Sequence, residues 1–300
     1  MGELRPGRAT AWVTDDREAL DALVNLLVVL ADNKYWLGRH LSEWAVGAPS
    51  LEVAVASAAI AQGELGQARV LYPLLEELPF PGPVDPTERD RGYQVSLLDR
   101  PFPTWPHAVS GLLLVDGAVT TMLEAMVGGP YDALARRVPR MLEEEAFHWD
   151  FADGRVRELA RLPGGLRQLQ ARVDESLEEL LCWFGPPGEQ GVEALRGQGL
   201  LGRGNSELRR AYLDRVGALL EEVGVRLRPE RSEESRLPWE RWNRVQRRLD
   251  PPASDRVSCP WCGSEEVERV GEVGPTVMTS QWICAACKSP FERIRRRGRS

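Results

Sequence analysis

The chain has 300 residues, of which 43% are hydrophobic, and this length suffices for one large domain with a small appendage. Its formal net charge of -7 argues against a general nucleic-acid coat, and apolar runs such as 112–115 are too short to span a bilayer. The first residues lack the apolar core of a secretory signal, which predicts a cytoplasmic protein.

Two long helices are predicted at the start of the chain. Apolar residues recur at helical spacing over 16–44, and Asp15 and Asp16 are available to cap the first turn. A second helix is predicted over 51–78, after the short break Gly-Ala-Pro-Ser at 47–50. The two helices therefore form a hairpin.

A Pro-rich segment over 79–106 follows and is predicted to be a long crossover. Helices are then predicted over 106–126 and 131–162, with the Gly-Gly-Pro break at 128–130 reversing the chain. Two helical hairpins joined by a long crossover are the ferritin-like version of the four-helix bundle. The predicted fold is therefore all-α, a ferritin-like four-helix bundle with extra helices and a small C-terminal β zinc ribbon.

The extra helices are predicted over 165–184 and 206–223, packed on the bundle and separated by a Gly-rich loop. The string GxxGxG at 199–204 in that loop follows no predicted strand, which discounts dinucleotide binding. A short helix is predicted over 238–249, within a charged linker. The predicted domains are the helical bundle 15–225, the linker 226–256, the zinc-ribbon module 257–292 and a basic disordered tail 293–300.

Four of the five cysteines form two Cys-x-x-Cys pairs near the C-terminus, namely Cys259, Cys262, Cys284 and Cys287. Two such pairs about twenty residues apart supply four thiolates that can close a tetrahedron around a metal. Structural zinc suits this ligand set better than a redox or iron–sulfur role, and a reducing cytoplasm disfavours disulfides. Cys182 lies in an apolar run and is predicted to be a buried structural thiol.

Lysine is rare in this chain, because only Lys34 and Lys288 are lysines among the 38 basic residues. Both helices of a hairpin rise equally per residue, so the break near 48–49 places Lys34 opposite Glu64. A solvent-facing role is sufficient for Lys288. Lys34, in contrast, is predicted to lie at the level where a bundle holds its metal ligands.

The second hairpin supplies further polar residues at the same level. Asp116 lies in an otherwise apolar stretch and is predicted to be interior, where a charge requires a partner. The break near 129–130 places Asp116 opposite the Glu run at 143–145. Glu145 and His148 are three residues apart and share a helix face.

This pattern resembles the donor set of a di-iron carboxylate bundle, which uses one carboxylate from each of two helices and a Glu-x-x-His pair from each of the other two. In the second hairpin that set is complete, with Asp116 and the pair Glu145 and His148. In the first hairpin Gln67 replaces the histidine that should follow Glu64 by three residues, and a lysine replaces the remaining carboxylate. The sequence therefore predicts a degenerate di-iron cluster.

Three interpretations of these polar residues remain open. The favoured one is a salt-bridged, metal-free cluster without iron, in which the ammonium of Lys34 takes over the electrostatic role of a metal. The second is a single-metal site, and the third is a chance arrangement of surface polar residues. The ligands of the single-metal site would be Glu64, Asp116, Glu145 and His148.

The stretch Leu-Gly-Arg-His-Leu-Ser-Glu-Trp at 37–44 and the stretch Glu-Leu-Gly-Gln-Ala-Arg at 64–69 resemble the signature of the PaaC-type subunit of the phenylacetyl-CoA ring epoxidase. The similarity covers about 15–225. It implies a ferritin-like, non-catalytic subunit that has lost its iron ligands. It also implies pairing with a di-iron catalytic PaaA-type subunit and with the other epoxidase subunits.

The cysteine-rich segment 259–294 is similar to the C-terminal metal-binding segment of the PaaD-type accessory protein. That family carries an extra cysteine near the position of Met278 in this chain. The combination of the two resemblances implies a fusion or a divergent branch.

The leading functional hypothesis is an accessory subunit of a multicomponent aromatic acyl-CoA monooxygenase in phenylacetate catabolism. One alternative is a ferritin-like metal-binding oxidase or oxygenase in its own right. The other alternative is a zinc-ribbon nucleic-acid-binding protein, which the small basic surplus after Phe291 supports only weakly. A homo-oligomer is a further alternative for assembly, and no membrane partner is expected. The sequence leaves the CoA ester open.

Overall fold

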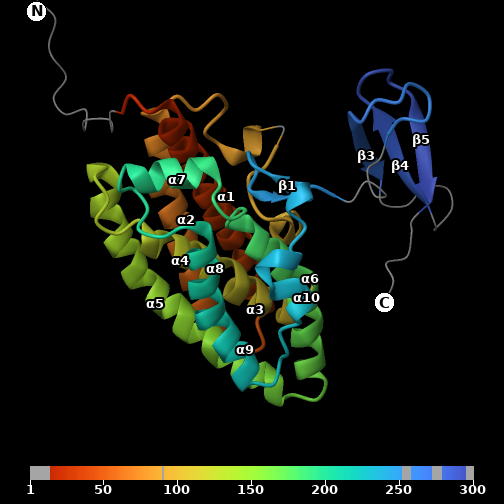
Figure 1. Ribbon diagram of the computed structural model, residues 1–300. Helices are drawn as coiled ribbons and strands as arrows, with labels where there is room; N and C mark the ends of the chain where they lie inside the picture. Colours follow the sequence, from red (N-terminus) through yellow and green to blue (C-terminus); the bar gives the residue numbers. More distant parts are fainter. Residues whose placement is uncertain (1–13, 90, 252–257, 272–278, 295–300) are drawn as a thin grey trace, which may run out of the picture. The chain divides into compact units, whose positions relative to one another are not determined.

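The computed structural model describes residues 14–89, 91–251, 258–271 and 279–294 (Figure 1). The chain divides into two compact units, Met1–Leu249 and Asp250–Ser300. Most of the predicted basic tail at 293–300 lies outside the described residues, as does part of the predicted linker.

The first hairpin consists of α1 (Arg17–Gly47) and α2 (Leu51–Glu76), which lie side by side (Figure 1). Each helix begins at a residue whose side chain accepts a hydrogen bond from a free backbone N–H of the first turn. The side chain of Asp16 accepts from the N–H of Ala19 in α1, and the side chain of Ser50 accepts from the N–H of Val53 in α2. The predicted helical hairpin is present, with ends within a few residues of the predicted ones.

The crossover between the hairpins is attached to α1 by a buried ion pair. Arg89 donates to both carboxylate oxygens of Asp32 at 2.7 Å, and the N–H of Tyr93 donates to the same carboxylate at 3.0 Å. Tyr72 on α2 donates a further hydrogen bond of 3.0 Å. The buried carboxylate of Asp32 therefore has one cationic partner and a full set of hydrogen-bond donors. The crossover contains the short helices η1 (Pro86–Glu88) and η2 (Ser96–Leu98).

The third long helix contains a π turn that the sequence did not predict. It consists of α3 (Trp105–Gly111), the π segment η3 (Leu112–Asp116) and α4 (Gly117–Ala125). In a π turn the backbone hydrogen bonds span five residues instead of the four of an α-helix. Within this π segment, the carbonyl of Leu114 accepts a hydrogen bond of 3.1 Å from the hydroxyl of Tyr212. By length and composition Trp105–Ala125 could cross a membrane, but 89% of its apolar window is buried, as expected of a core helix.

The fourth helix, α5 (Asp132–Arg161), completes the bundle with an apolar stripe that faces the other three helices. The predicted all-α, ferritin-like bundle is confirmed, together with a small C-terminal β region. α6 (Gly165–Trp183) packs against α3 and α5. Cys182 in α6 is fully buried, which raises the pKa of its thiol to about 12 and agrees with a structural role.

The segment after α6 differs from the predicted loop. It contains α7 (Gln190–Gly197), which packs against α1, and Glu189 caps this helix by accepting from two backbone N–H groups. The Gly-rich string at 199–204 follows α7 directly. The extra helix predicted over 206–223 is divided by a second π turn. Its parts are α8 (Asn205–Tyr212), η4 (Leu213–Gly217) and α9 (Ala218–Glu222).

The predicted short helix over 238–249 is wrong. A single 3-10 turn, η6 (Trp239–Arg241), precedes a hairpin of the two-residue strands β1 (Trp242–Asn243) and β2 (Arg248–Leu249). Arg247 explains the difference, because it adopts a φ of 48° and its buried guanidinium donates to backbone carbonyls at the end of α6, at 3.1 Å for Trp183. These carbonyls have no partner within their own helix.

The region predicted as a linker from residue 226 instead belongs to the first compact unit as far as Leu249. Leu237 is buried there, and the segment also contains the short helices α10 (Pro229–Ser232) and η5 (Glu234–Arg236). Apolar burial and buried arginines hold this segment against the helices, despite its charged composition.

The second unit contains a three-stranded antiparallel sheet in the order β3-β4-β5. The pairing joins Val267 to Cys284 and Trp282 to Phe291. The strands are β3 (Val267–Gly271), β4 (Thr279–Cys284) and β5 (Pro290–Ile294). The sheet places one cysteine pair before β3 and the other at the turn between β4 and β5.

Candidate functional site

Lys34 is fully buried in the middle of the bundle, and its ammonium contacts a carboxylate from each of the other three long helices. Its Nζ lies 2.6 Å from Oδ1 of Asp116, 2.7 Å from Oε1 of Glu145 and 3.1 Å from Oε1 of Glu64. An ammonium has three donors, and all three are used here. We call Lys34, Glu64, Asp116, Glu145 and His148 the charged cluster.

Local structure brings the helices of the charged cluster together. Gly38, one turn beyond Lys34 on α1, faces Glu64, and a Cβ added there would lie 2.8 Å from the Cβ of Glu64. Only glycine therefore allows α1 and α2 to approach this closely. On the opposite side Asp116 ends the π segment, and Thr120 one turn later donates to Oε2 of Glu145 at 3.0 Å.

His148 contacts the same three carboxylates. Its Nδ1 lies 2.9 Å from Glu64, 3.5 Å from Glu145 and 3.6 Å from Asp116. Burial alone would lower the pKa of this imidazole, but its interactions with the carboxylates raise the pKa to about 12. On its other edge, Nε2 would lie 3.0 Å from a Cβ added at Gly63. The ring is therefore a buried imidazolium held against a glycine.

The charged cluster carries more negative than positive charge. Burial alone would lower the pKa of Lys34, but the three carboxylates hold it well above its ordinary value, so the side chain is an ammonium. With His148 protonated, three carboxylates and two cations give a formal charge of −1. In addition, Oε2 of Glu64 accepts no hydrogen bond from the described residues. A buried carboxylate oxygen without a donor is energetically unfavourable.

Gln67 does not join these contacts, although its spacing from Glu64 predicted that it would. Its Nε2 donates to Oε2 of Glu144 at 3.2 Å and to the carbonyl of Met141 at 3.5 Å. The structure therefore brings together five of the six predicted cluster residues and places the sixth about one turn away, on the side of α2 that faces α5.

The charged cluster has the elements of a single-metal site but does not fit a di-iron centre. One ligand atom from each of Glu64, Asp116, Glu145 and His148 can be chosen so that all four lie within 4.8 Å of one another. A di-iron bundle uses about six ligands, whereas this set has four. Any cation bound by the same oxygens would also have to displace the ammonium of Lys34, which already contacts three of the four residues.

A cavity of about 340 Å³ adjoins the charged cluster, and sequence reasoning missed it. Asp116, Glu145 and His148 form its polar wall. Arg215 and Glu124 form an ion pair beside it. The apolar wall includes Leu112, Leu113, Leu142 and Trp149. The π turn that helps to shape this wall has no clear signal in the apolar sequence of the helix.

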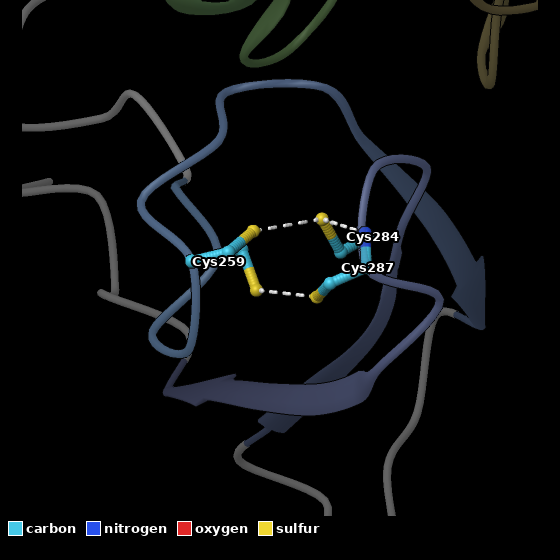
Figure 2. Close-up of side chains that lie close together, drawn as sticks. Cys259, Cys284 and Cys287 are labelled. Carbon is cyan, nitrogen blue, oxygen red and sulfur yellow. Dashed lines mark hydrogen bonds between the residues drawn. The ribbon is translucent and has the colours of Figure 1, made fainter.

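The four cysteines of the second unit form the other candidate site (Figure 2). Sγ of Cys259 lies 3.6 Å from Sγ of Cys287, and Sγ of Cys262 lies 3.5 Å from Sγ of Cys284. These distances are far longer than a disulfide bond of about 2.05 Å. They are close to the separation of about 3.8 Å that Zn–S bonds of about 2.3 Å give in a tetrahedron. The four sulfur atoms therefore fit zinc.

The backbone of the cysteine site has the same form in both halves. The N–H of Gly263 donates to the carbonyl of Cys259, and the N–H of Lys288 donates to the carbonyl of Cys284, both at 2.9 Å. Gly263 and Lys288 both have positive φ, 73° and 58°. Hydrogen bonds from Ser289 lower the pKa of Cys287 to about 6, whereas at Cys262 the hydrogen bond from Ser264 is outweighed by those with Cys284 and Cys287, which raise the pKa of Cys262 to about 12. Lys288 is exposed, in agreement with its predicted solvent-facing role.

Comparisons with known proteins assign both parts of the chain to families. Residues 7–248 match the family described as Phenylacetic acid catabolic protein, which groups PaaA and PaaC. Residues 246–295 match the PaaD zinc beta ribbon domain. No curated protein matches the chain. With its helical bundle covered by the first match and its four-cysteine ribbon by the second, the chain belongs to the phenylacetic acid catabolic protein family and carries a PaaD-type zinc ribbon.

Proposed function

We propose that this chain is a PaaC-type, non-catalytic subunit of a multicomponent monooxygenase acting on phenylacetyl-CoA or a similar aromatic acyl-CoA. It works in the cytoplasm beside a di-iron PaaA-type subunit and the other subunits of the complex. The observation that carries this proposal is the ammonium of Lys34, which lies between three carboxylates that each come from a different helix.

The physical argument concerns how the carboxylates are compensated. Three carboxylates buried together require positive charge, and a dinuclear metal centre would supply it in a catalytic bundle. Lys34 and protonated His148 supply two positive charges without a metal. The bundle therefore retains its packing without iron, and its role in the complex is to support and position the partner that holds iron.

In the second unit we propose that Cys259, Cys262, Cys284 and Cys287 bind one structural zinc ion. The sulfur distances support this proposal. Zinc would compensate the thiolates and join the two cysteine pairs. No residue of this site is assigned a catalytic role.

The proposal is tested by purifying the full-length chain from its native host and identifying the proteins that accompany it. We expect a ferritin-like partner in stoichiometric amount, with iron in the partner. A chain that purifies alone, without any ferritin-like partner, would contradict the proposed role. A complex that retains monooxygenase activity after the partner's iron is removed would also contradict it.

A second candidate function is a metal-dependent oxidase or oxygenase built on the bundle itself. The unpartnered Oε2 of Glu64 and the adjoining 340 Å³ cavity favour this alternative. It predicts iron bound in stoichiometric amount to the isolated chain, and loss of that iron on Asp116→Ala or Glu145→Ala. Isolated chain that takes up no iron would exclude it.

A further inference from the structure

A groove of about 550 Å³ runs between α2 and α5 on the outside of the bundle, separate from the cavity beside the charged cluster. Three arginines of α5 line it, namely Arg136, Arg137 and Arg140. α2 contributes Gly63 and Gly66 to the same groove. Its volume lies in the range of small-molecule sites, which is about 300–1,000 Å³.

The groove is open because α2 places glycine where a larger side chain would fill it. No described atom lies within 4 Å of a Cβ added at Gly66. Glycine within a helix costs about 1 kcal/mol relative to alanine, and here no close contact in the described structure requires it. Beneath Gly63 lies the ring of His148, so the floor of the groove is rigid helix backbone over the buried cluster.

The charge of the groove is opposite to that of the chain. Three guanidinium groups face one carboxylate of the lining, Glu144, although the whole chain carries a net charge of -7. Among the described residues, neither Arg137 nor Arg140 forms a salt bridge within 4.0 Å, although Nη1 of Arg137 donates to the carbonyl of Ala133 at 2.7 Å. Arg136 lies 3.8 Å from the exposed carboxylate of Asp132, a contact that water weakens. The groove therefore carries positive charge that no close carboxylate of the described residues neutralises, with Arg137 engaged only by a backbone carbonyl.

The remaining lining indicates what else a ligand would need. Gln67 is only 2% exposed and forms part of the wall, and its Oε1 has no hydrogen-bond partner among the described residues. This oxygen is itself buried, so Gln67 offers a ligand in the groove no accessible acceptor. Val70 and Met141 supply apolar surface on the two sides of the groove.

We propose that the α2–α5 groove binds a small molecule that carries a phosphate or diphosphate group. Arginine forks recognise phosphate oxygens through paired N–H donors, and Arg137 and Arg140 lie one turn apart on the face of α5 that borders the groove. The uncharged part of the ligand lies over Gly66 and against Val70 and Met141. This site is independent of the role proposed for the charged cluster.

The first test is calorimetric titration of the full-length chain with inorganic pyrophosphate at low ionic strength. We expect saturable binding that weakens at least about tenfold in the double variant Arg137→Gln/Arg140→Gln, as loss of two charge-assisted contacts implies. Arg161→Gln is the control, because Arg161 lies at the far end of the same helix and outside the groove. No saturable binding, or an equal loss in the control variant, would overturn the proposal.

The second test keeps the arginines and fills the groove. Gly66→Leu places a side chain in the open space and should weaken pyrophosphate binding at least about tenfold, with helical content unchanged. Gly66→Ala is the matched control, because a single methyl group leaves most of the groove open. Unchanged binding by folded Gly66→Leu would show that pyrophosphate binds elsewhere and would overturn the assignment to this groove.

Discussion

Two groups of four metal-ligating side chains occur among the described residues, and they differ in what lies between the ligand atoms. In the ribbon, four sulfur atoms lie close together, and no lysine or arginine side chain of the described residues lies between them. In the bundle, the ammonium of Lys34 lies within 3.1 Å of three of the four residues. Ligand types and spacing alone would assign a metal to both groups, whereas charge compensation distinguishes them.

A third buried charge defines what a purely structural ion pair looks like in the same bundle. Asp32 has one guanidinium partner, Arg89, and four donated hydrogen bonds. The charged cluster instead has an excess of carboxylates, and one oxygen of Glu64 has no hydrogen-bond partner in the part of the chain that the structure describes. The excess is difficult to explain as stabilisation, since buried ions cost several kcal/mol each to desolvate.

The largest effect that we expect is the loss of the ribbon on removal of zinc. A strong chelator, or Cys284→Ser, should unfold residues 258–294, because structural zinc contributes about 10–16 kcal/mol of apparent binding free energy. The helical signal of the bundle should persist. Circular dichroism and amide NMR spectra measure the two units separately, and Cys182→Ala is the control that should retain zinc. A ribbon that stays folded without metal would end the distinction drawn between the two clusters.

The next effect is expected on replacing the buried lysine. Lys34→Met leaves three buried carboxylates with a single cation, and we expect the free energy of unfolding to fall by about 3–5 kcal/mol. Lys288→Met is the matched control, since the other lysine of the chain is exposed and should change stability by less than about 0.5 kcal/mol. Urea unfolding followed by circular dichroism measures both. Equal stability of the two variants would show that Lys34 does not compensate the carboxylates.

A smaller, pH-dependent effect is expected from His148. Its pKa in the folded chain, about 12, exceeds the ordinary value of 6.5, so its contribution to stability is complete below pH 6.5. That contribution is lost progressively as the pH rises towards 12. The stability difference between the wild type and His148→Gln should therefore shrink between about pH 6 and about pH 9.

Unfolding by urea at several pH values checks the sign of this effect. His107→Gln is the control, because burial and the neighbouring Arg172 lower the pKa of His107. The stability difference for this control should not fall over the same range. A constant difference for His148→Gln would mean that the imidazole is neutral in the cluster, which would raise the excess negative charge.

The smallest effect concerns the close approach of α1 and α2. Gly38→Ala forces a methyl group to within 2.8 Å of the Cβ of Glu64, and we expect a loss of about 1–3 kcal/mol as the helices separate. Gly66→Ala, on the open side of α2, should instead stabilise the chain by up to about 1 kcal/mol. Thermal unfolding of the two variants compares them directly. A neutral Gly38→Ala would contradict the tight packing assigned to the cluster.

The sequence predicted features that depend on local periodicity and on chain reversal. Equal rise in the two helices of each hairpin was enough to place Lys34 opposite Glu64, which it contacts, and Asp116 opposite Glu145, which share Lys34 as their partner. The orientation of Gln67 was not predictable in the same way. It depends on Glu144 and on a backbone carbonyl of α5, which are available only once the bundle has formed.

Other features were missed because tertiary contacts determine them. The π turn at 112–116 contains a carbonyl that accepts a hydrogen bond from Tyr212, about a hundred residues later, and nothing in the apolar run itself indicates the turn. The hairpin at 242–249 replaces a predicted helix because Arg247 reaches carbonyls at the end of α6. α7 lies in a Gly-rich stretch too short for periodicity to distinguish it from a loop.

The most direct test of the account is the metal content of the full-length chain and of Lys34→Ala after loading with one equivalent of Zn²⁺, removal of free zinc, anaerobic incubation with Fe²⁺ alone and removal of free iron. We predict about one zinc per chain in both proteins, no iron in the wild type and iron bound by the variant, whose four ligands no longer surround an ammonium. Stoichiometric iron in the wild type, lost on Asp116→Ala, would contradict the claim that Lys34 stands in place of a metal.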